Sequence, residues 1–209
     1  MKKLSFTLAA AICITLAGCS DKSGSSTSDL KMYELAGNVK SVKVLSVNNG
    51  IENLAYNLEF DENGMATAHS YDKLWDEKID ISTERNEKNE MVKYVAVPEG
   101  GDMPYVEAKY VYDENGYMTE IEALWYGESY TTEKITYNEE NNREKTVVEY
   151  NDYDMVEVDE MEYTYKNFDS KGNWTEREVR KKSYRKYGDG NIENKQTVVT
   201  PEKREIIYY

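Results

Sequence analysis

The stretch from Tyr112 to Tyr117 reads Tyr-Asp-Glu-Asn-Gly-Tyr and has the residue types of a tight turn between two β-strands. Asp113 can accept hydrogen bonds from backbone N–H groups a few residues later, which closes a turn of this kind. Gly116 adopts left-handed backbone angles without a Cβ clash, and the flanking tyrosines favour extended strands. We therefore predict a β-hairpin whose loop runs from Asp113 to Gly116.

The same turn pattern recurs along the chain, beginning at residues 60, 85, 112, 137 and 168. Phe60–Gly64 and Phe168–Gly172 are close copies. Arg85–Asn89 and Tyr137–Asn141 are weaker copies in which Asn replaces the final Gly, and Asn is the next most suitable residue for left-handed angles. A step of about 25 residues fits two strands and two turns per unit, as in a repeat architecture.

The repeated turns also predict which residues face each other across each hairpin. A four-residue loop places Tyr112 opposite Tyr117 and Lys109 opposite Glu120. Such a register puts mostly apolar side chains on one face of the hairpin, and a slip of one residue would mix the two faces.

For the hairpin formed by the expected strands 156–168 and 174–184, matching opposite charges predicts a turn centred at Lys171. Glu162 then lies opposite Arg180, and Glu160 opposite Lys182. The basic cluster that begins at Arg180 therefore has an ordinary explanation, because it balances the acidic strand beside it. The alternative is a patch that binds a partner.

From residue 39 onward the sequence predicts strands and turns, with no long helical stripe. We expect an all-β fold: a single antiparallel β-meander of about 12 strands built from hairpin repeats, twisted and able to curl into a roll or open barrel. The expected strands are 39–47, 53–60, 65–71, 78–84, 91–97, 104–112, 117–125, 129–137, 143–150, 156–168, 174–184, 192–199 and 203–209.

The N-terminus has the pattern of a secretory signal. Two lysines precede a mostly apolar run at residues 4–17, which is too short for an ordinary membrane-spanning helix. The following sequence, Leu16-Ala17-Gly18-Cys19, resembles the lipobox of bacterial lipoproteins. The alternative is an ordinary signal peptide with a chance cysteine.

The lipobox resemblance implies that residues 1–18 are a removed signal peptide and that Cys19 carries acyl chains such as palmitate. Several acyl chains on one residue give stable anchoring. Ser20, rather than Asp, implies the outer membrane under the sorting rule of some Gram-negative bacteria. Residues 19–33 are polar and read as the lipidated Cys and a flexible tether, which leaves 34–209 as the β-repeat domain.

Composition excludes several functions. After removal of Cys13 with the signal, the anchor Cys19 is the last thiol, so no disulfide, zinc site or thiol nucleophile is expected. Removing two of the 26 basic residues with the signal leaves 24 against 40 acidic ones, a net charge of −16. Nucleic acid is therefore not an expected partner, because its recognition requires a basic surface.

The turns carry a second resemblance. Tyr112–Gly116, with Thr119, and the Phe168–Thr175 stretch, which reads Phe-Asp-Ser-Lys-Gly-Asn-Trp-Thr, are similar to the YD repeats of Rhs-type proteins. In those proteins, strand-turn-strand units coil into long β-sheets. The resemblance covers about residues 55–185 and assigns no catalytic residue.

The sequence contains no recognisable catalytic motif. His69 is the single histidine and has no nucleophile motif such as G-x-S-x-G to serve, so we expect it to be structural. The Asp-x-Asn-Gly turns offer too few oxygens for a calcium loop. We therefore predict no catalytic residue, no metal ligand and no cofactor.

Four aromatic residues at or near turns are the candidate ligand-binding residues: Trp75, Trp125, Tyr126 and Trp174. Aromatic faces at loop tips can stack on sugar rings. The alternative is that they cover the ends of the sheet core.

Three functions remain open. The first is a non-enzymatic cell-envelope lipoprotein, anchored in the membrane by its N-terminal lipid, that acts as a binding or structural module for a glycan or an envelope protein. The second is a carboxylate-based glycan hydrolase, which requires acidic residues that converge in a cleft beside Trp125 or Trp174. The third is an immunity or assembly partner of a secreted toxin, suggested by the Rhs-like units.

Overall fold

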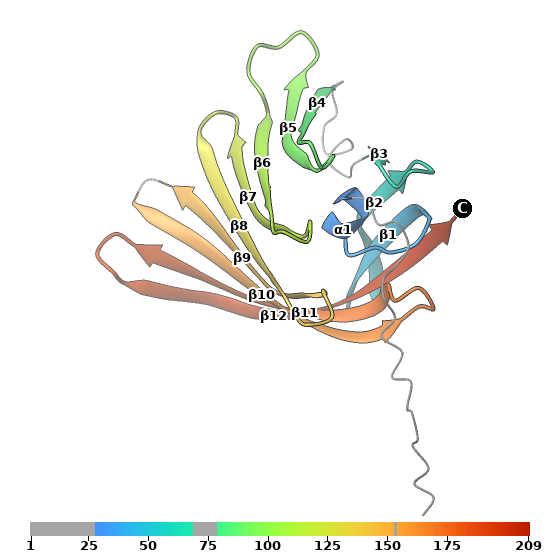
Figure 1. The fold of residues 1–209 in the computed structure, drawn as a ribbon. Coiled ribbons are helices and arrows are strands. Elements are labelled where there is room, and N and C mark those ends of the chain that lie inside the picture. Colours follow the sequence, from blue (N-terminus) through green and yellow to red (C-terminus); the bar gives the residue numbers. More distant parts are fainter. Residues whose placement is uncertain (1–27, 69–78, 153) are drawn as a thin grey trace, which may run out of the picture.

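The computed structural model describes residues 28–68, 79–152 and 154–209, which form one antiparallel sheet and one short helix (Figure 1). The elements are α1 (Ser28–Met32), β1 (Val39–Asn48), β2 (Ile51–Phe60), β3 (Ala66–Ala68), β4 (Ile79–Arg85), β5 (Met91–Pro98), β6 (Val106–Tyr112), β7 (Met118–Trp125), β8 (Ser129–Tyr137), β9 (Arg143–Asp152), β10 (Met155–Phe168), β11 (Trp174–Tyr187) and β12 (Ile192–Tyr208).

The twelve strands lie in the order β3-β2-β1-β12-β11-β10-β9-β8-β7-β6-β5-β4. Strands that follow each other in the sequence pair with each other, apart from β3 and β4, which form the two opposite edges of the sheet. In addition, the first strand, β1, pairs with the last strand, β12. The sheet curls strongly and stays open between these edges (Figure 1). The predicted fold class, an all-β meander of about 12 strands, is confirmed.

All five predicted turns form, and they share one geometry. In each, a side-chain oxygen of the first turn residue accepts hydrogen bonds of 2.8 to 3.1 Å from the N–H groups two and four residues later. The fourth residue has a positive φ, including the two positions where Asn replaces Gly. The first residues are Asp61, Asn86, Asp113, Asn138 and Asp169. These five turns, called the corner turns below, confirm the repeat.

The predicted register of the central hairpin is wrong by one residue beside the turn and by two residues beyond it. Tyr112 pairs with Met118 rather than Tyr117, and Lys109 pairs with Glu122 rather than Glu120. The Asp113 N–H bonds to the Tyr117 carbonyl, so the loop between these two residues is shorter than predicted, and Thr119 is an extra residue in β7 between Met118 and Glu120. A shift of two keeps the side chains beyond the turn on their predicted faces.

The charge-matched register of the β10–β11 hairpin is confirmed. Glu162 pairs with Arg180 and Glu160 with Lys182. The Arg180 guanidinium lies 3.7 Å from the Glu162 carboxylate on the exposed surface. This arrangement agrees with the ordinary explanation of the basic cluster.

The two strands expected at 192–199 and 203–209 are one continuous strand, β12. Pro201 lies between the two expected strands, and proline lacks the N–H needed within a sheet. Pro201 pairs with β11, whereas the pairing of β12 with β1 ends one residue later, at Glu202. One side of the strand is therefore free at Pro201, and the strand continues through it.

The packed domain begins earlier than residue 34. Asp29, Leu30 and Met32 are buried, together with Leu35. We call residues 29–37 the N-terminal plug, since they lie inside the curve of the sheet (Figure 1). The end of the predicted tether at 33 is therefore wrong, because residues 29–33 are part of the core. No helix among the described residues is long and apolar enough to span a membrane.

Candidate functional site

The N-terminal plug contacts both edges of the open sheet. The Asp29 carboxylate accepts a 2.9 Å hydrogen bond from the Ala66 N–H in β3. The same carboxylate pairs with the Arg85 guanidinium in β4 through two bonds of 2.9 and 2.8 Å. Arg85 directly precedes a corner turn, and Ala66 directly follows one. The plug therefore joins the edges at the corner-turn end of the sheet.

The plug also contacts other corner turns. The Lys31 Nζ donates to the Asn115 carbonyl at 2.8 Å. Asn173, at the end of the last corner turn, is fully buried and bonds to both backbone groups of Ala36, with the N–H at 2.6 Å and the carbonyl at 2.9 Å. The repeated turns therefore form one end of the curled sheet, and the plug closes that end.

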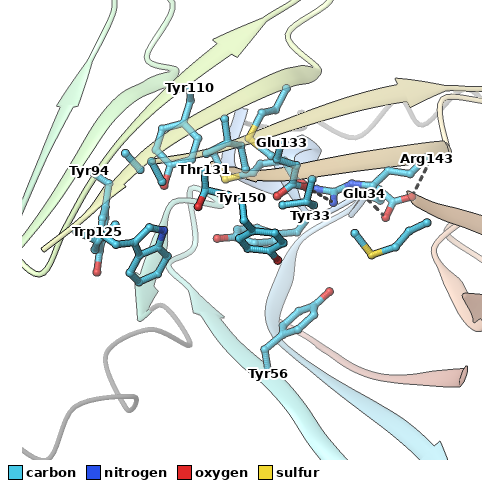
Figure 2. A pocket seen from close by; sticks show the side chains of 18 of the residues that line it. Tyr33, Glu34, Tyr56, Tyr94, Tyr110, Trp125, Thr131, Glu133, Arg143 and Tyr150 are labelled. Atoms are coloured by element: carbon cyan, nitrogen blue, oxygen red, sulfur yellow. Dashed lines mark hydrogen bonds and ion pairs between the residues drawn. The ribbon is translucent and has the colours of Figure 1, made fainter. Parts of the chain in front are cut away.

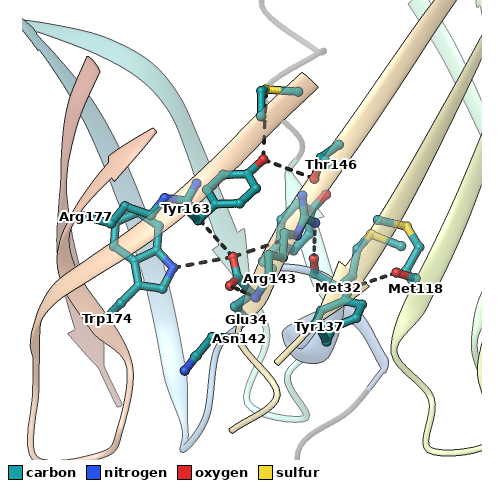
Figure 3. A network of polar contacts seen from close by, with 12 residues as sticks. Met32, Glu34, Met118, Tyr137, Asn142, Arg143, Thr146, Tyr163, Trp174 and Arg177 are labelled. Atoms are coloured by element: carbon teal, nitrogen blue, oxygen red, sulfur yellow. Dashed lines mark hydrogen bonds and ion pairs between the residues drawn. The ribbon is translucent and has the colours of Figure 1, made fainter. Parts of the chain in front are cut away.

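Glu34 is the centre of a buried polar network, shown in Figure 3. Its Oε1 accepts hydrogen bonds from the Arg143 N–H at 2.9 Å and the Tyr165 hydroxyl at 2.6 Å. Its Oε2 accepts from Arg177 Nη1 at 3.1 Å and Trp174 Nε1 at 3.4 Å. Glu34 has a φ of 56°, an unfavourable angle for a residue with a Cβ. The contacts of its carboxylate hold it there.

This network keeps Glu34 ionised. Burial alone would raise the pKa of Glu34, but nearby positive charges and a hydroxyl donor outweigh burial and lower that pKa to about 2. The groups that lower it are Arg177, Arg143, Arg204 and Tyr165. The carboxylate therefore remains charged at every physiological pH.

Trp174 is fully buried, so its ring cannot stack on an external ligand. The Arg204 guanidinium lies 3.7 Å from its ring centroid, and the Arg177 guanidinium lies 4.0 Å from it. Both distances fit cation–π contacts. The indole also donates to Glu34. Of the two expectations for Trp174, the structure agrees with a role in covering the end of the core.

Above the plug, the inner face of the sheet lines a pocket of about 650 Å³ (Figure 2). A volume of this size is typical of small-molecule sites. The aromatic lining residues are Tyr33, Tyr56, Tyr94, Tyr110, Trp125 and Tyr150. The aliphatic ones are Met32, Val106, Ala108, Met118, Ile121, Ala123, Val148 and Met161. The polar ones are Glu34, Ser129, Thr131, Glu133, Arg143, Arg177 and Arg204.

The two ends of the pocket differ in chemistry. Glu34 and Arg143 lie at the plug end, where β9 begins, whereas Trp125 and Tyr150 lie toward the other ends of their strands. We call that other end the far end. Figure 2 shows Trp125 well away from Arg143, with Tyr150 between them. The pocket therefore has a charged plug end and an aromatic far end.

Glu133 is the second carboxylate of the pocket. Its nearest charged partner is Arg143, whose Nη1 lies 3.8 Å from the carboxylate. Burial raises the pKa of Glu133, and the Arg143 charge opposes that rise. Glu133 therefore has fewer polar contacts than Glu34, although both line the same pocket.

The candidate residues predicted from the sequence are not brought together. Trp125 lines the pocket. Tyr126 is 49% exposed on the next turn, where its ring packs against Tyr105 at 5.4 Å between centroids. Trp75, His69 and Cys19 lie outside the described residues. Within the described part of the chain, no group of three or more His, Cys, Asp or Glu side chains could hold a metal ion.

Sequence reasoning missed the charged residues of the pocket. Arg177 is two residues before the buried Val179 and therefore shares its face of β11. Arg204 likewise shares a face of β12 with the partly buried Ile206. A charged residue on the same face of a strand as apolar residues was the pattern that could have indicated these two arginines. Glu34 gave no such signal, because it precedes the first strand.

Comparisons with known proteins add little. No family model matches the chain, and no curated protein matches it. Among solved structures, the chain is similar to a porin-like protein from Bacteroides uniformis, with 11% sequence identity and a TM-score of 0.34. The similarity covers 81% of this chain and 98% of that protein. A TM-score this low establishes neither family nor function, so the site is interpreted from its own geometry.

Proposed function

We propose that this chain is a non-enzymatic cell-envelope lipoprotein that binds a small molecule in the pocket of its curled sheet. The supporting observation is a pocket of about 650 Å³ whose wall is mostly aromatic and aliphatic, with its charged groups at one end. This combination is the usual chemistry of small-molecule sites. An interior pocket can accept a small glycan or another small organic molecule, whereas a folded protein cannot enter it.

The pocket chemistry favours binding over glycan hydrolysis. Hydrolysis by carboxylates needs two such groups beside the scissile bond, one of them free to act as nucleophile or base. Glu34 lines the pocket, but four protein donors already occupy its oxygens. Only Glu133 then remains as a candidate acid, and one carboxyl does not complete the required pair.

The proposed lipid anchor would orient the pocket relative to the membrane. Helix α1 begins at Ser28, nine residues after Cys19. Nine residues span at most about 30 Å, so lipid on Cys19 would keep the plug end of the sheet near a membrane. The far end of the pocket would then point away from that membrane. We place the protein in the outer membrane of a Gram-negative bacterium on the basis of the lipobox and Ser20.

Two substitutions on the same strand test the pocket. Ala123 lines it, whereas the neighbouring Leu124 is 37% exposed on the opposite face of β7. N-phenyl-1-naphthylamine, an uncharged dye that fluoresces in apolar surroundings, serves as the probe. We expect saturable dye binding to the unmodified chain and to Leu124→Phe. Ala123→Phe fills the pocket, and we expect it to weaken dye binding at least about tenfold.

The control requirement is that both variants keep the β-sheet circular dichroism of the unmodified chain. Equal dye binding by Ala123→Phe and Leu124→Phe, or no saturable binding by the unmodified chain, would show that the pocket is not a ligand site.

A further inference from the structure

Arg143 and Glu133 line the pocket as a polar pair that lacks full hydrogen bonding, although Arg143 Nη2 donates to the Met32 carbonyl at 2.9 Å. Arg143 Nη1 and Glu133 Oε1 are 3.8 Å apart, which exceeds hydrogen-bond distance. The Nε of Arg143 is buried without a hydrogen-bond partner, although Glu34 lies 3.8 Å from it. Both side chains line the pocket and keep some exposure, 17% for Arg143 and 25% for Glu133. The gap between Nη1 and the Glu133 carboxylate can take a group that hydrogen-bonds to both, and hydrogen bonds to charged groups are stabilising.

The charges around this pair are already balanced. Three guanidinium groups, of Arg143, Arg177 and Arg204, lie among three carboxylates. The carboxylates are those of Glu34, Glu133 and Glu202. The whole chain carries a net charge of −14, which disfavours the approach of an anion. A ligand group at this place therefore needs both a donor and an acceptor, without a charge of its own.

The walls that continue from this pair are mainly apolar. Ile121, Val148 and Met161 line the pocket, and Trp125 lines it toward the far end. These side chains offer mostly dispersion contacts, and the polar groups beside them include the hydroxyls of Ser129 and Thr131 and the Trp125 indole N–H. A ligand with hydroxyls along its whole length would exchange its many bonds to water for these few partners. The body of the ligand is therefore expected to be mainly apolar.

We propose that the pocket binds an amphipathic molecule with a slender apolar body and a neutral, hydroxyl-bearing head, which enters head first. This proposal rests on the proposed function and narrows its ligand class. The head hydroxyl accepts a hydrogen bond from Arg143 and donates one to Glu133. The apolar body lies against Ile121, Val148 and Met161 and extends to Trp125.

Charged heads fit this position less well. A carboxylate beside Glu133 would place two negative charges together, and a quaternary ammonium group would approach Arg143 without a donor for Glu133. Repulsion between like charges is large where water is excluded. The pair therefore selects for a neutral head as well as binding it.

Three dodecyl amphiphiles that differ only in the head test this selection. They are monododecanoylglycerol, dodecanoate and dodecyltrimethylammonium, each used below its micelle concentration. Their affinities are measured by calorimetry and by displacement of N-phenyl-1-naphthylamine. We expect monododecanoylglycerol to bind about tenfold or more tightly than either charged amphiphile, since hydrogen bonds to charged groups contribute about 1.5–3 kcal/mol.

Glu133→Gln removes the charge and keeps the shape. We expect it to weaken monododecanoylglycerol binding about tenfold and to improve dodecanoate binding, because the repulsion is gone. Glu133→Asp keeps the charge but withdraws the carboxylate, so we expect weaker binding of the neutral probe and continued rejection of dodecanoate. Glu162→Gln, on the exposed surface of β10, is the matched control and should change neither affinity.

The outcomes separate this proposal from the proposed function. If the dye binds in the pocket but dodecanoate or the ammonium amphiphile binds best, the neutral head is wrong and the pocket remains a ligand site. Dye binding that none of the three amphiphiles displaces contradicts the amphipathic ligand. Unchanged affinities in both Glu133 variants contradict the head-first placement. Failure of the dye itself to bind contradicts both.

Discussion

Asp29 and Arg85 form a two-bond ion pair that joins the start of the fold to one edge of its sheet. The Asp29 side chain is fully buried, and its two oxygens lie 2.9 and 2.8 Å from the Arg85 guanidinium nitrogens. The carboxylate also accepts the Ala66 N–H from the opposite edge strand. One side chain therefore links β3 to β4 across the open side of the sheet.

We predict that Asp29→Asn destabilises the fold by about 3 kcal/mol, because it leaves a partly buried guanidinium without its counter-charge. Urea denaturation measures this loss. Hydrogen exchange should show faster exchange of the β4 amides, since that edge is released first. Glu162→Gln breaks an exposed ion pair with Arg180 and should cost less than about 1 kcal/mol. Equal losses in both variants would contradict the role given to Asp29.

The sequence alone predicted the strands and the corner turns well, because these depend on local chemistry. An Asp or Asn followed three residues later by Gly or Asn favours the same geometry in each of the five corner turns. The register of the hairpin at Asp113 was missed by up to two residues, since the bulge in β7 depends on how the strands pack. Pairing of β12 with β1 was also missed, because nothing near Val39 indicates a partner at the other end of the chain.

The candidate site was harder to predict than the fold. Trp125 was named for its aromatic face and does line the pocket, whereas Trp174 was named for the same reason and is buried. Trp174 is buried because its indole donates to Glu34 inside the fold. Glu34 directly follows the segment that was expected to be a tether, so the sequence did not indicate a buried partner there. Three arginines from distant strands surround it, and no spacing in the sequence links them.

Acid should destabilise the fold through Glu34. The unfolded chain protonates this side chain near its ordinary pKa of 4.5, whereas the folded chain keeps it ionised down to a pKa of about 2. The stabilisation is therefore complete above pH 4.5 and is lost as the pH falls toward 2. A difference of this size corresponds to about 3 kcal/mol.

Glu34→Gln isolates this contribution from that of other carboxylates. We expect the variant to be less stable at neutral pH, because three arginines lose their shared carboxylate. Its unfolding free energy should also fall less between neutral pH and acid than that of the unmodified chain. Glu162→Gln should keep the full acid dependence. Parallel pH profiles for Glu34→Gln and the unmodified chain would contradict this assignment.

The proposed lipid anchor has a direct test at Cys19. The lipobox resemblance predicts that Cys19→Ser abolishes acylation, so the chain should lose palmitate labelling and move from the membrane fraction to the soluble fraction. Cys13→Ser, within the predicted signal, is the matched control and should leave both properties unchanged. Continued labelling of Cys19→Ser would show that the lipid, if present, is attached elsewhere.

The corner turns predict that replacing the fourth turn residue by Ala destabilises the fold at two equivalent positions. Gly116 and Asn141 hold the same place in their turns, with φ values of 80° and 60°. Gly116→Ala should destabilise the fold by about 1–2 kcal/mol, because Cβ strains the left-handed backbone. The added Cβ would also lie 3.1 Å from the Glu90 carboxylate. Asn141→Ala should cost about 1 kcal/mol from backbone strain alone.

Asn141→Gly is the decisive companion variant. Gly removes the strain of a positive φ but increases the freedom of the unfolded chain, and these effects nearly cancel, so we expect a change within about 0.5 kcal/mol. Thermal unfolding of the three variants gives the order Asn141→Gly, Asn141→Ala, Gly116→Ala, from most to least stable. A large loss in Asn141→Gly would show that the Asn side chain, rather than its backbone angle, maintains that turn, and the five corners would then not be equivalent.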